Sequence, residues 1–217
     1  IGRSIVMTAH HDNAKSPLPP LLQSGESAQR GGISIPFNCP NLLLNKTTLK
    51  IFNQFYFNKQ SQKTSPFKTE LQKYFYPLDR ISHWNLLYGK RGFVQYQCVI
   101  PNKYALIGTQ KILEALSQSS YPSFLGVLKR FTAENLGLLS FPMAGFTLAL
   151  DIPILDNGLF KVLDQLDEIV ITHGGRVYLA KDARLKPETF RAMYPKYNEW
   201  LAIKNKIDPN NIFSSSL

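Results

Sequence analysis

Apolar and polar side chains alternate along Phe93–Ile100, and this alternation predicts a β-strand. One face of the strand is apolar and carries Val94, Tyr96, Cys98 and Ile100. The opposite face places the amides of Gln95 and Gln97 among apolar neighbours. A buried amide without hydrogen-bond partners costs about 1–3 kcal/mol. This second face is therefore either exposed to solvent or the wall of a pocket that binds hydroxyl groups or phosphate.

The residues after this strand predict an alternation of helices and strands. Apolar residues spaced by three and four predict a helix over 103–119 and a second helix from Asn157 to Gly174. Runs of apolar and β-branched residues predict strands over 124–131, 146–152 and 176–180. The order βαββαβ is that of a ferredoxin-like antiparallel sheet backed by helices, so the predicted fold class is α+β. A C-terminal helical tail, divided at Pro195, is predicted over 186–213.

The N-terminal third of the sequence predicts short elements separated by polar loops. Residues 3–9 have the pattern of a short strand, and residues 12–32 are rich in Ser, Pro, Gly and Gln, which is typical of a long surface loop. Residues 47–57 predict a short helix, and residues 58–68 predict a second, basic loop. A further helix is predicted after residue 79, with Asp79 or Ser82 as its N-cap.

The composition is that of a globular protein with a basic surface. Of the 217 residues, 44% are hydrophobic and 12% are aromatic, enough for one large domain or two small ones. The net charge is +10, and between Lys46 and Arg91 the basic residues are opposed only by Glu70 and Asp79. Such a patch suits nucleic acid, anionic lipid headgroups or a phosphorylated substrate, and equally a solubilising surface.

Several classes of protein find no support. No apolar run reaches the roughly 20 residues that span a bilayer, and because the apolar start is short and contains Arg3, we expect no signal peptide there. Because the chain begins with Ile1, we expect a fragment of a longer protein. The two cysteines form no disulfide framework and the histidines lack metal-ligand spacing, so no metal is predicted. Lys90–Tyr96 resembles the RNP1 signature of RNA-binding domains but lacks its Gly/Ala–aromatic pair and lies on the wrong strand, so no nucleic-acid partner is predicted.

Three further places carry candidate chemistry. Lys129 shares a strand face with apolar residues, so its ammonium group either reaches solvent or binds an anion. Tyr178 and Lys181 lie at the end of a predicted strand beside other charged residues, which indicates a surface ion pair or a place where a cofactor docks. The small residues Thr147 and Ala149 share one strand face and leave room either for a ligand or for close packing.

Several segments together resemble one family, over about Tyr74–Phe213 and more weakly at Gly2–Arg3. These segments are Phe75–Asp79, Trp84–Asn85, Tyr88–Gly89, Gly92–Gln97, Ser123–Leu125, Leu139–Pro142, Ala180–Asp182 and Met193–Pro195. In combination they are similar to the decaprenylphosphoryl-β-D-ribose oxidase family, the flavin subunits of a 2′-epimerase. That family lies within the vanillyl-alcohol-oxidase type of FAD-linked oxidases.

The resemblance implies that the chain has two parts. Residues 1–175 would form a substrate-binding (cap) domain that is incomplete at its N-terminus. Residues 176–217 would return to an FAD-binding domain, most of which has no counterpart in this sequence. FAD would then be held mostly by a domain absent from this chain, and we expect the isolated chain to be inactive.

The resemblance also implies roles for individual residues. The substrate pocket in front of the flavin ring would be lined by Gln95, Gln97, Lys129, Phe131, Thr147 and Ala149. Thr147 and Ala149 stand where the mycobacterial enzymes carry Asn and a reactive Cys. Tyr178 and Lys181 match residues next to the flavin. The implied reaction is hydride transfer from ribose C2′ to flavin, with Lys181 or Lys129 as the catalytic cation that stabilises the developing negative charge.

The predicted function is therefore FAD-dependent oxidation of a ribose hydroxyl on a polyprenyl-phosphate pentose, a cell-wall polysaccharide precursor. The alternatives are an aldonolactone or other sugar oxidase, and a stand-alone anion- or ligand-binding module without catalysis. The resemblance further implies an NAD(P)H-dependent keto-sugar reductase as a partner and a place in the bacterial cytoplasm or periplasm. The basic stretch Lys46–Lys73 would then form a peripheral contact with the membrane that holds the lipid substrate.

Overall fold

The computed structural model describes residues 5–11, 33–40, 43–63, 65–69, 71–75, 81–182 and 184–214. Its helices are α1 (Lys46–Ser61), α2 (Leu71–Phe75), α3 (Ala105–Gln118), α4 (Gly158–Thr172), α5 (Pro187–Met193) and α6 (Tyr197–Ile207). Its strands are β1 (Ile33–Ser34), β2 (Ile81–Ser82), β3 (Phe93–Pro101), β4 (Leu125–Phe131), β5 (Gly145–Pro153) and β6 (Arg176–Val177). Two 3-10 helices are η2 (Trp84–Tyr88) and η3 (Leu179–Lys181).

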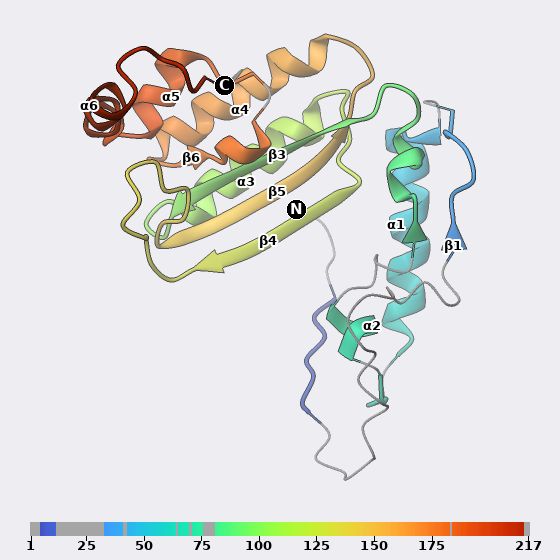
Figure 1. The fold of residues 1–217 in the computed structure, drawn as a ribbon. Coiled ribbons are helices and arrows are strands. Elements are labelled where there is room, and N and C mark those ends of the chain that lie inside the picture. Colours follow the sequence, from blue (N-terminus) through green and yellow to red (C-terminus); the bar gives the residue numbers. More distant parts are fainter. Residues whose placement is uncertain are drawn as a thin grey trace, which may run out of the picture.

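Four antiparallel strands form the central sheet in the order β4-β5-β3-β6 (Figure 1). Along the chain the elements run β3, α3, β4, β5, α4, β6, which is the predicted βαββαβ order. Strands β3 and β5 pair over their whole length, from Phe93 opposite Pro153 to Pro101 opposite Gly145. This arrangement confirms the predicted ferredoxin-like α+β fold.

The hydrophobic core lies between one face of this sheet and helices α3 and α4. The sheet contributes Tyr96, Cys98 and Ile100 from β3 and Leu148, Leu150 and Ile152 from β5. The two helices contribute Ile112, Leu116, Leu159, Leu163, Leu166 and Val170. Cys98 is fully buried in this core, as predicted. Because side chains alternate along a strand, the remaining side chains of β3 and β5 point to the opposite, open face.

Local contacts set both ends of α4. The Asp156 carboxylate accepts the N–H of Gly158 at 2.7 Å and also the hydroxyl of Tyr121. At the other end Gly174 has a φ of 67°, and its N–H donates to the carbonyl of Ile171 at 2.8 Å. This left-handed conformation favours glycine and ends the helix. The chain then enters β6, the strand that pairs with β3.

The predictions for the N-terminal third are partly wrong. Residues 5–9, the described part of the predicted strand 3–9, have no regular structure, and the predicted loop 12–32 lies outside the described residues. Helix α1 confirms the predicted helix but continues to Ser61, where a bond of 2.7 Å between the Gln54 and Asn58 side chains supports the extra turn. The helix predicted after residue 79 is the short η2, which follows His83 with a φ of 58°.

The C-terminal part confirms the helical tail but shortens the last strand. The predicted strand 176–180 ends at Val177, because the N–H of Lys181 bonds to the carbonyl of Tyr178 at 3.0 Å and closes η3. Helices α5 and α6 follow, and Pro195 lies between them as predicted.

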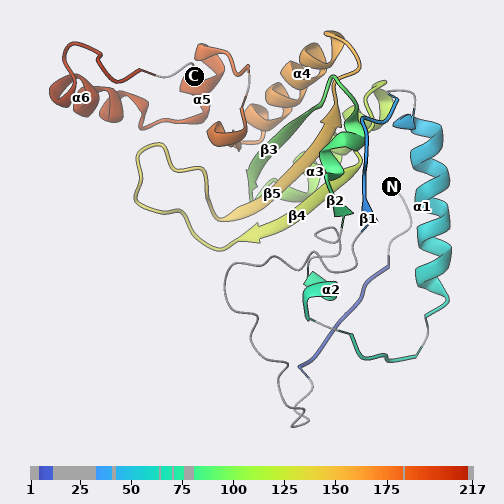
Figure 2. The same cartoon turned by 45° about the vertical axis from the view of Figure 1, so that its right-hand side comes forward.

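Helix α1 stands beyond the end of the central sheet and covers neither of its faces, as both views show (Figures 1 and 2). The ammonium group of Lys46 donates to the carbonyl of Ser117 at 2.9 Å and links the start of α1 to the end of α3. No residue of α1 is buried. Helices α1, α3 and α4 therefore do not cover the open face of the sheet, whereas Tyr88 of η2 stacks on Phe93 at one end of it, with ring centroids 4.4 Å apart.

Candidate functional site

The open face of the sheet collects most of the side chains that the sequence singled out. Directly paired residues of an antiparallel sheet share a face. Gln97 pairs with Ala149, and Ala149 in turn pairs with Val127 of β4. Thr147 lies opposite Lys129, two residues further along the same strands and therefore on the same face. The register thus brings the predicted substrate-binding residues of three strands onto one surface.

The glutamine amides on this face are half-buried, and each is bonded to β5. Gln95 donates through Nε2 to Oδ1 of Asp151 at 2.8 Å. Gln97 donates through Nε2 to Oγ1 of Thr147 at 2.9 Å. Of the two interpretations that the sequence left open, the structure favours an ordered polar wall over two solvated glutamines. Both amides are held before any ligand binds.

Asp151 is the residue of this face that sequence reasoning missed. It is 2% exposed, and its Oδ2 atom has no hydrogen-bond partner within the described part of the chain. Burial raises the pKa of Asp151 above its ordinary value, while the Gln95 hydrogen bond and the Lys181 charge oppose that shift. A signal was present in the sequence, because Asp151 follows Thr147 and Ala149 at the spacing of two that keeps side chains on one strand face.

Tyr178 and Lys181 lie along the β6 edge of the open face. The N–H of Tyr178 donates to the carbonyl of Gln97 at 2.8 Å, and the Tyr178 ring stacks on Phe141 with centroids 4.5 Å apart. Lys181 is half-buried in η3, and its charge acts on the Asp151 carboxylate without a direct ion pair between the two. The predicted cofactor-binding residues are thus adjacent to the glutamine strand.

Lys129 and Phe131 lie on β4, at the other edge of the sheet. The side chain of Lys129 is exposed, so it reaches solvent in the free chain. Phe131 meets Phe141 edge to face, with centroids 6.0 Å apart. Because Phe141 also stacks on Tyr178, an aromatic row crosses this end of the open face. Lys129 and Lys181 therefore lie on opposite edges, and the structure does not bring the two candidate catalytic cations together.

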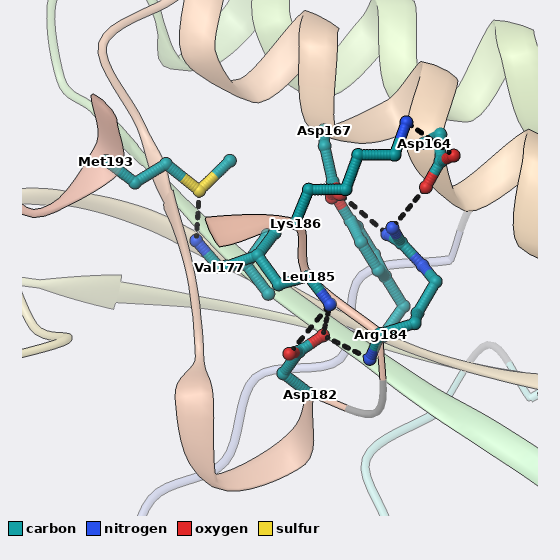
Figure 3. A network of polar contacts seen from close by, with 9 residues as sticks. Asp164, Asp167, Val177, Asp182, Arg184, Leu185, Lys186 and Met193 are labelled. Carbon is teal, nitrogen blue, oxygen red and sulfur yellow. Dashed lines mark hydrogen bonds and ion pairs between the residues drawn. The ribbon is translucent and has the colours of Figure 1, made fainter. Parts of the chain in front are cut away.

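An ion-pair network holds the segment that carries Lys181 (Figure 3). Arg184 pairs with Asp164 and with Asp167, both on α4. Asp182 instead accepts the backbone N–H groups of Arg184 and Leu185. Arg184 is thus paired with α4, and its ion pairs do not include Asp182. Burial raises the pKa of Asp167, and the Arg184 charge opposes that shift.

Two findings bound the chemistry of the described residues. They contain no group of three or more His, Cys, Asp or Glu side chains placed to hold a metal ion. None of their helices combines the length and the apolar character that crossing a bilayer requires.

Comparison with known proteins relates this chain to oxidases. A family described as D-arabinono-1,4-lactone oxidase matches residues 155–217, which cover α4, the Tyr178–Lys181 segment and the C-terminal helices. The match therefore includes the β6 edge of the open face. Strand β3, with Gln95 and Gln97, lies outside it.

Individual relatives extend the similarity over most of the chain. Decaprenylphosphoryl-β-D-ribose oxidase of Mycolicibacterium smegmatis is 37% identical over 185 residues, which are 85% of this chain and 40% of that protein. An uncharacterized protein in the mprA 5′ region of Streptomyces coelicolor is 37% identical over 130 residues, 58% of this chain and 34% of that protein. The chain spans between a third and two fifths of these relatives' length and resembles the C-terminal part of the ribose oxidase.

Proposed function

We propose that this chain is the substrate-binding, C-terminal part of an FAD-dependent oxidase that oxidises a hydroxyl group of a pentose carried on a polyprenyl phosphate. Residues 1–175 would form the substrate-binding part and residues 176–217 the segment that packs on an FAD-binding domain. One observation carries the proposal: a single open sheet face holds ordered amides at its centre, with a lysine on each edge. The similarity to a ribose oxidase supports the same conclusion.

The central residues of the face suit a sugar. With their Nε2 atoms bonded to β5, Gln95 and Gln97 direct their carbonyl oxygens toward incoming hydroxyl donors. Ala149 lies between them and β4 and leaves space for a ring. On the exposed edge, the Lys129 ammonium group would bind the phosphate. The face therefore binds and orients the substrate through hydroxyl groups on one side and an anion on the other.

The β6 edge would hold the isoalloxazine ring of FAD. The stacked pair of Tyr178 and Phe141 offers an aromatic surface, and Lys181 supplies a cation beside it. When bound, FAD supplies the acceptor for the hydride that leaves the oxidised carbon. The sequence offers no glycine-rich loop for the nucleotide, so Tyr178 and Lys181 would hold only the ring, and a further domain would hold the phosphates.

We assign charge stabilisation to Lys181. As the hydroxyl group loses its proton to solvent and its carbon loses a hydride to the flavin, negative charge develops on the oxygen, and a nearby ammonium group would lower the energy of that state. The Arg184 ion pairs to α4 restrict the segment that follows Lys181. Lys181 would therefore be the catalytic cation, and Lys129 the anion-binding lysine.

Helix α1 favours the lipid-linked substrate over a free sugar or lactone. Its large apolar side chains are exposed: Ile51 by 65%, Phe52 by 61%, Phe55 by 68% and Tyr56 by 47%. Lysines 46, 50 and 59 lie on the same helix. Exposed aromatic residues together with lysines are typical of helices that lie in the surface of an anionic membrane. We therefore propose α1 as the membrane contact.

The test uses the polypeptide that carries these residues at its natural length. We expect a bound flavin spectrum that bleaches when a polyprenyl-phosphoryl ribose is added without oxygen. Lys181→Ala should slow bleaching at least about 100-fold, since one preorganised charge contributes about 10²–10³ to a rate. Lys161→Ala, on the exposed side of α4, is the matched control. Faster bleaching by D-arabinono-1,4-lactone would favour the lactone oxidase, and a colourless protein would favour a binding module.

A further inference from the structure

Asp151 is a buried acid on the open face of the sheet, and neither the sequence nor the relatives assigned it a role. Its backbone carbonyl accepts two hydrogen bonds, from the N–H of Phe124 at 3.2 Å and from the hydroxyl of Ser123 at 3.1 Å. Its side chain reaches the amide of Gln95 at 2.8 Å. The carboxylate is thus held rigidly against one substrate-facing residue.

The chemistry of this pair is asymmetric. The two ends of a glutamine amide have nearly the same shape, so their hydrogen-bond partners decide which end points where. An ionised carboxylate accepts hydrogen bonds and cannot donate them. Only the NH₂ end of Gln95 can therefore face Asp151, and the carbonyl Oε1 must point away from it. A charge-assisted bond of this kind is stronger than one between neutral groups.

Gln97 provides the contrast two residues further along β3. Its partner is the Thr147 hydroxyl, 2.9 Å away, and a hydroxyl group both donates and accepts. Thr147 therefore permits either orientation of the Gln97 amide, whereas Asp151 permits one for Gln95. Within the described chain, Oε1 of Gln95 receives no hydrogen bond from another side chain, and the residue is only half-buried. That oxygen is free for a ligand.

We propose that Asp151 is a positioning residue that fixes Gln95 as a hydrogen-bond acceptor, so that this part of the site selects ligands with a hydroxyl donor there. Asp151 acts through Gln95, because Asp151 is only 2% exposed and its neighbours on the open face cover it. The inference that the selected ligand is a sugar rests on the proposed function. The inference that Asp151 fixes the Gln95 amide does not depend on it.

The Lys181 charge supports this role. Burial raises the pKa of Asp151, and the Lys181 charge opposes that shift and so favours the ionised form, which is the form that fixes Gln95. The hydroxyl of Tyr88, the other ionisable group coupled to Asp151, is held neutral because burial raises its pKa. Lys181, the candidate catalytic lysine, therefore favours the charged form of Asp151, and that charged form sets the orientation of the Gln95 amide.

The first experiment reads the amide directly by NMR on the chain labelled with nitrogen-15. The side-chain NH₂ signal of Gln95, assigned by its loss in Gln95→Glu, should be shifted downfield and exchange slowly with water. Asp151→Asn, whose amide both donates and accepts, should remove that protection, while the Gln97 signal and the Glu168→Gln control stay unchanged. An unprotected Gln95 signal in the unsubstituted chain overturns the proposal.

The second experiment measures the affinity of the chain for D-ribose and for its monodeoxy analogues. Each sugar is titrated into the labelled chain, and binding is followed by the same side-chain NMR signals. At least one analogue should bind the unsubstituted chain more weakly by about 3- to 10-fold, the worth of one hydrogen bond. Asp151→Asn should reduce that discrimination below about twofold while D-ribose still binds. Unchanged discrimination overturns the role of Asp151 and leaves the oxidase proposal standing. If no pentose binds, the oxidase proposal fails, and the NMR signal alone decides whether Asp151 fixes the amide.

Discussion

Helices α1 and α4 are similar in length and both rich in apolar residues, yet their surroundings differ. In α4, Leu159, Leu163, Leu166 and Val170 are at most 1% exposed and pack on the sheet. In α1 no residue is buried, and Phe55 is 68% exposed. Asn45 and Thr48 form a reciprocal capping box at the start of α1, so local bonds define it where packing does not.

This difference shows what an apolar helix face indicates. Helical spacing of apolar residues predicts a helix, but it does not say what covers the face. For α4 the cover is the sheet of the same chain. For α1 the lysines and aromatic side chains favour a surface outside the chain, which is the basis of the proposed membrane contact.

The largest expected effect is on folding stability. Leu163→Ala should lower the free energy of unfolding by about 2–5 kcal/mol, because it leaves a cavity in the core. Phe55→Ala removes a larger side chain from α1 but should change stability by less than about 0.5 kcal/mol, since that ring is already in water. Urea denaturation of both variants tests this. A cost above 2 kcal/mol for Phe55→Ala would show that α1 is packed in the free chain.

The sequence predicted the sheet domain well, for reasons visible in α4 and β3. Alternation in β3 and the three-and-four spacing of α4 reflect the burial of one face of each element in the core. The short β6 could not be predicted, because hydrogen bonds made by Tyr178 and Lys181 turn the chain into η3 although the residues favour a strand. Here tertiary and turn contacts override local propensity.

The sequence predicted most residues of the candidate site but not how they pair and bond with one another. Gln95, Gln97, Thr147 and Ala149 could be assigned to strand faces from alternation alone. Alternation does not show which residues of neighbouring strands lie opposite one another. That depends on the register of the sheet, because a slip by one residue would move every side chain to the other face. Asp151 was missed because an acid near the end of a strand usually reaches solvent, and only the packing shows that it is buried.

The next effect is on membrane binding. Replacing Phe52 and Phe55 together by Ser should weaken binding to vesicles of phosphatidylglycerol and phosphatidylcholine by at least about tenfold, because burying each aromatic side chain contributes about 1.5–3 kcal/mol. Sedimentation with the vesicles measures this. The matched control is Leu106→Ser and Ile107→Ser on α3, which removes two apolar side chains that are 73% and 54% exposed. An equal loss of vesicle binding in both double variants would show that the contact is not specific to α1. Binding that does not weaken when salt is added would show that the lysines do not contribute to it.

A smaller effect concerns pH and the buried acid of the sheet domain. Because burial raises the pKa of Asp151 in the folded state, the unfolded chain releases this proton first as pH rises. Between the unfolded and folded pKa values the folded state then binds more protons, so the contribution of Asp151 to stability falls as pH rises. Asp151→Asn should therefore gain stability relative to the unsubstituted chain between pH 3.5 and 7. Urea denaturation at four pH values measures this, and a relative loss over that range would contradict the raised pKa.

The change expected to affect the fold least is the introduction of a thiol on the open face. Thiol reactivity distinguishes the packed face of the sheet from this open face. Burial raises the pKa of Cys98 to about 12, and Cys98 is fully buried, so iodoacetamide should label only the partly exposed Cys39 in the native chain. Ala149→Cys places a thiol on the open face between Gln97 and Val127 and should create a second reactive site at little cost in stability. Mass spectrometry of the labelled chain counts the sites. If the new thiol stays unlabelled while Cys39 reacts, Ala149 does not face a ligand-accessible surface, and the placement of the substrate on this face is wrong.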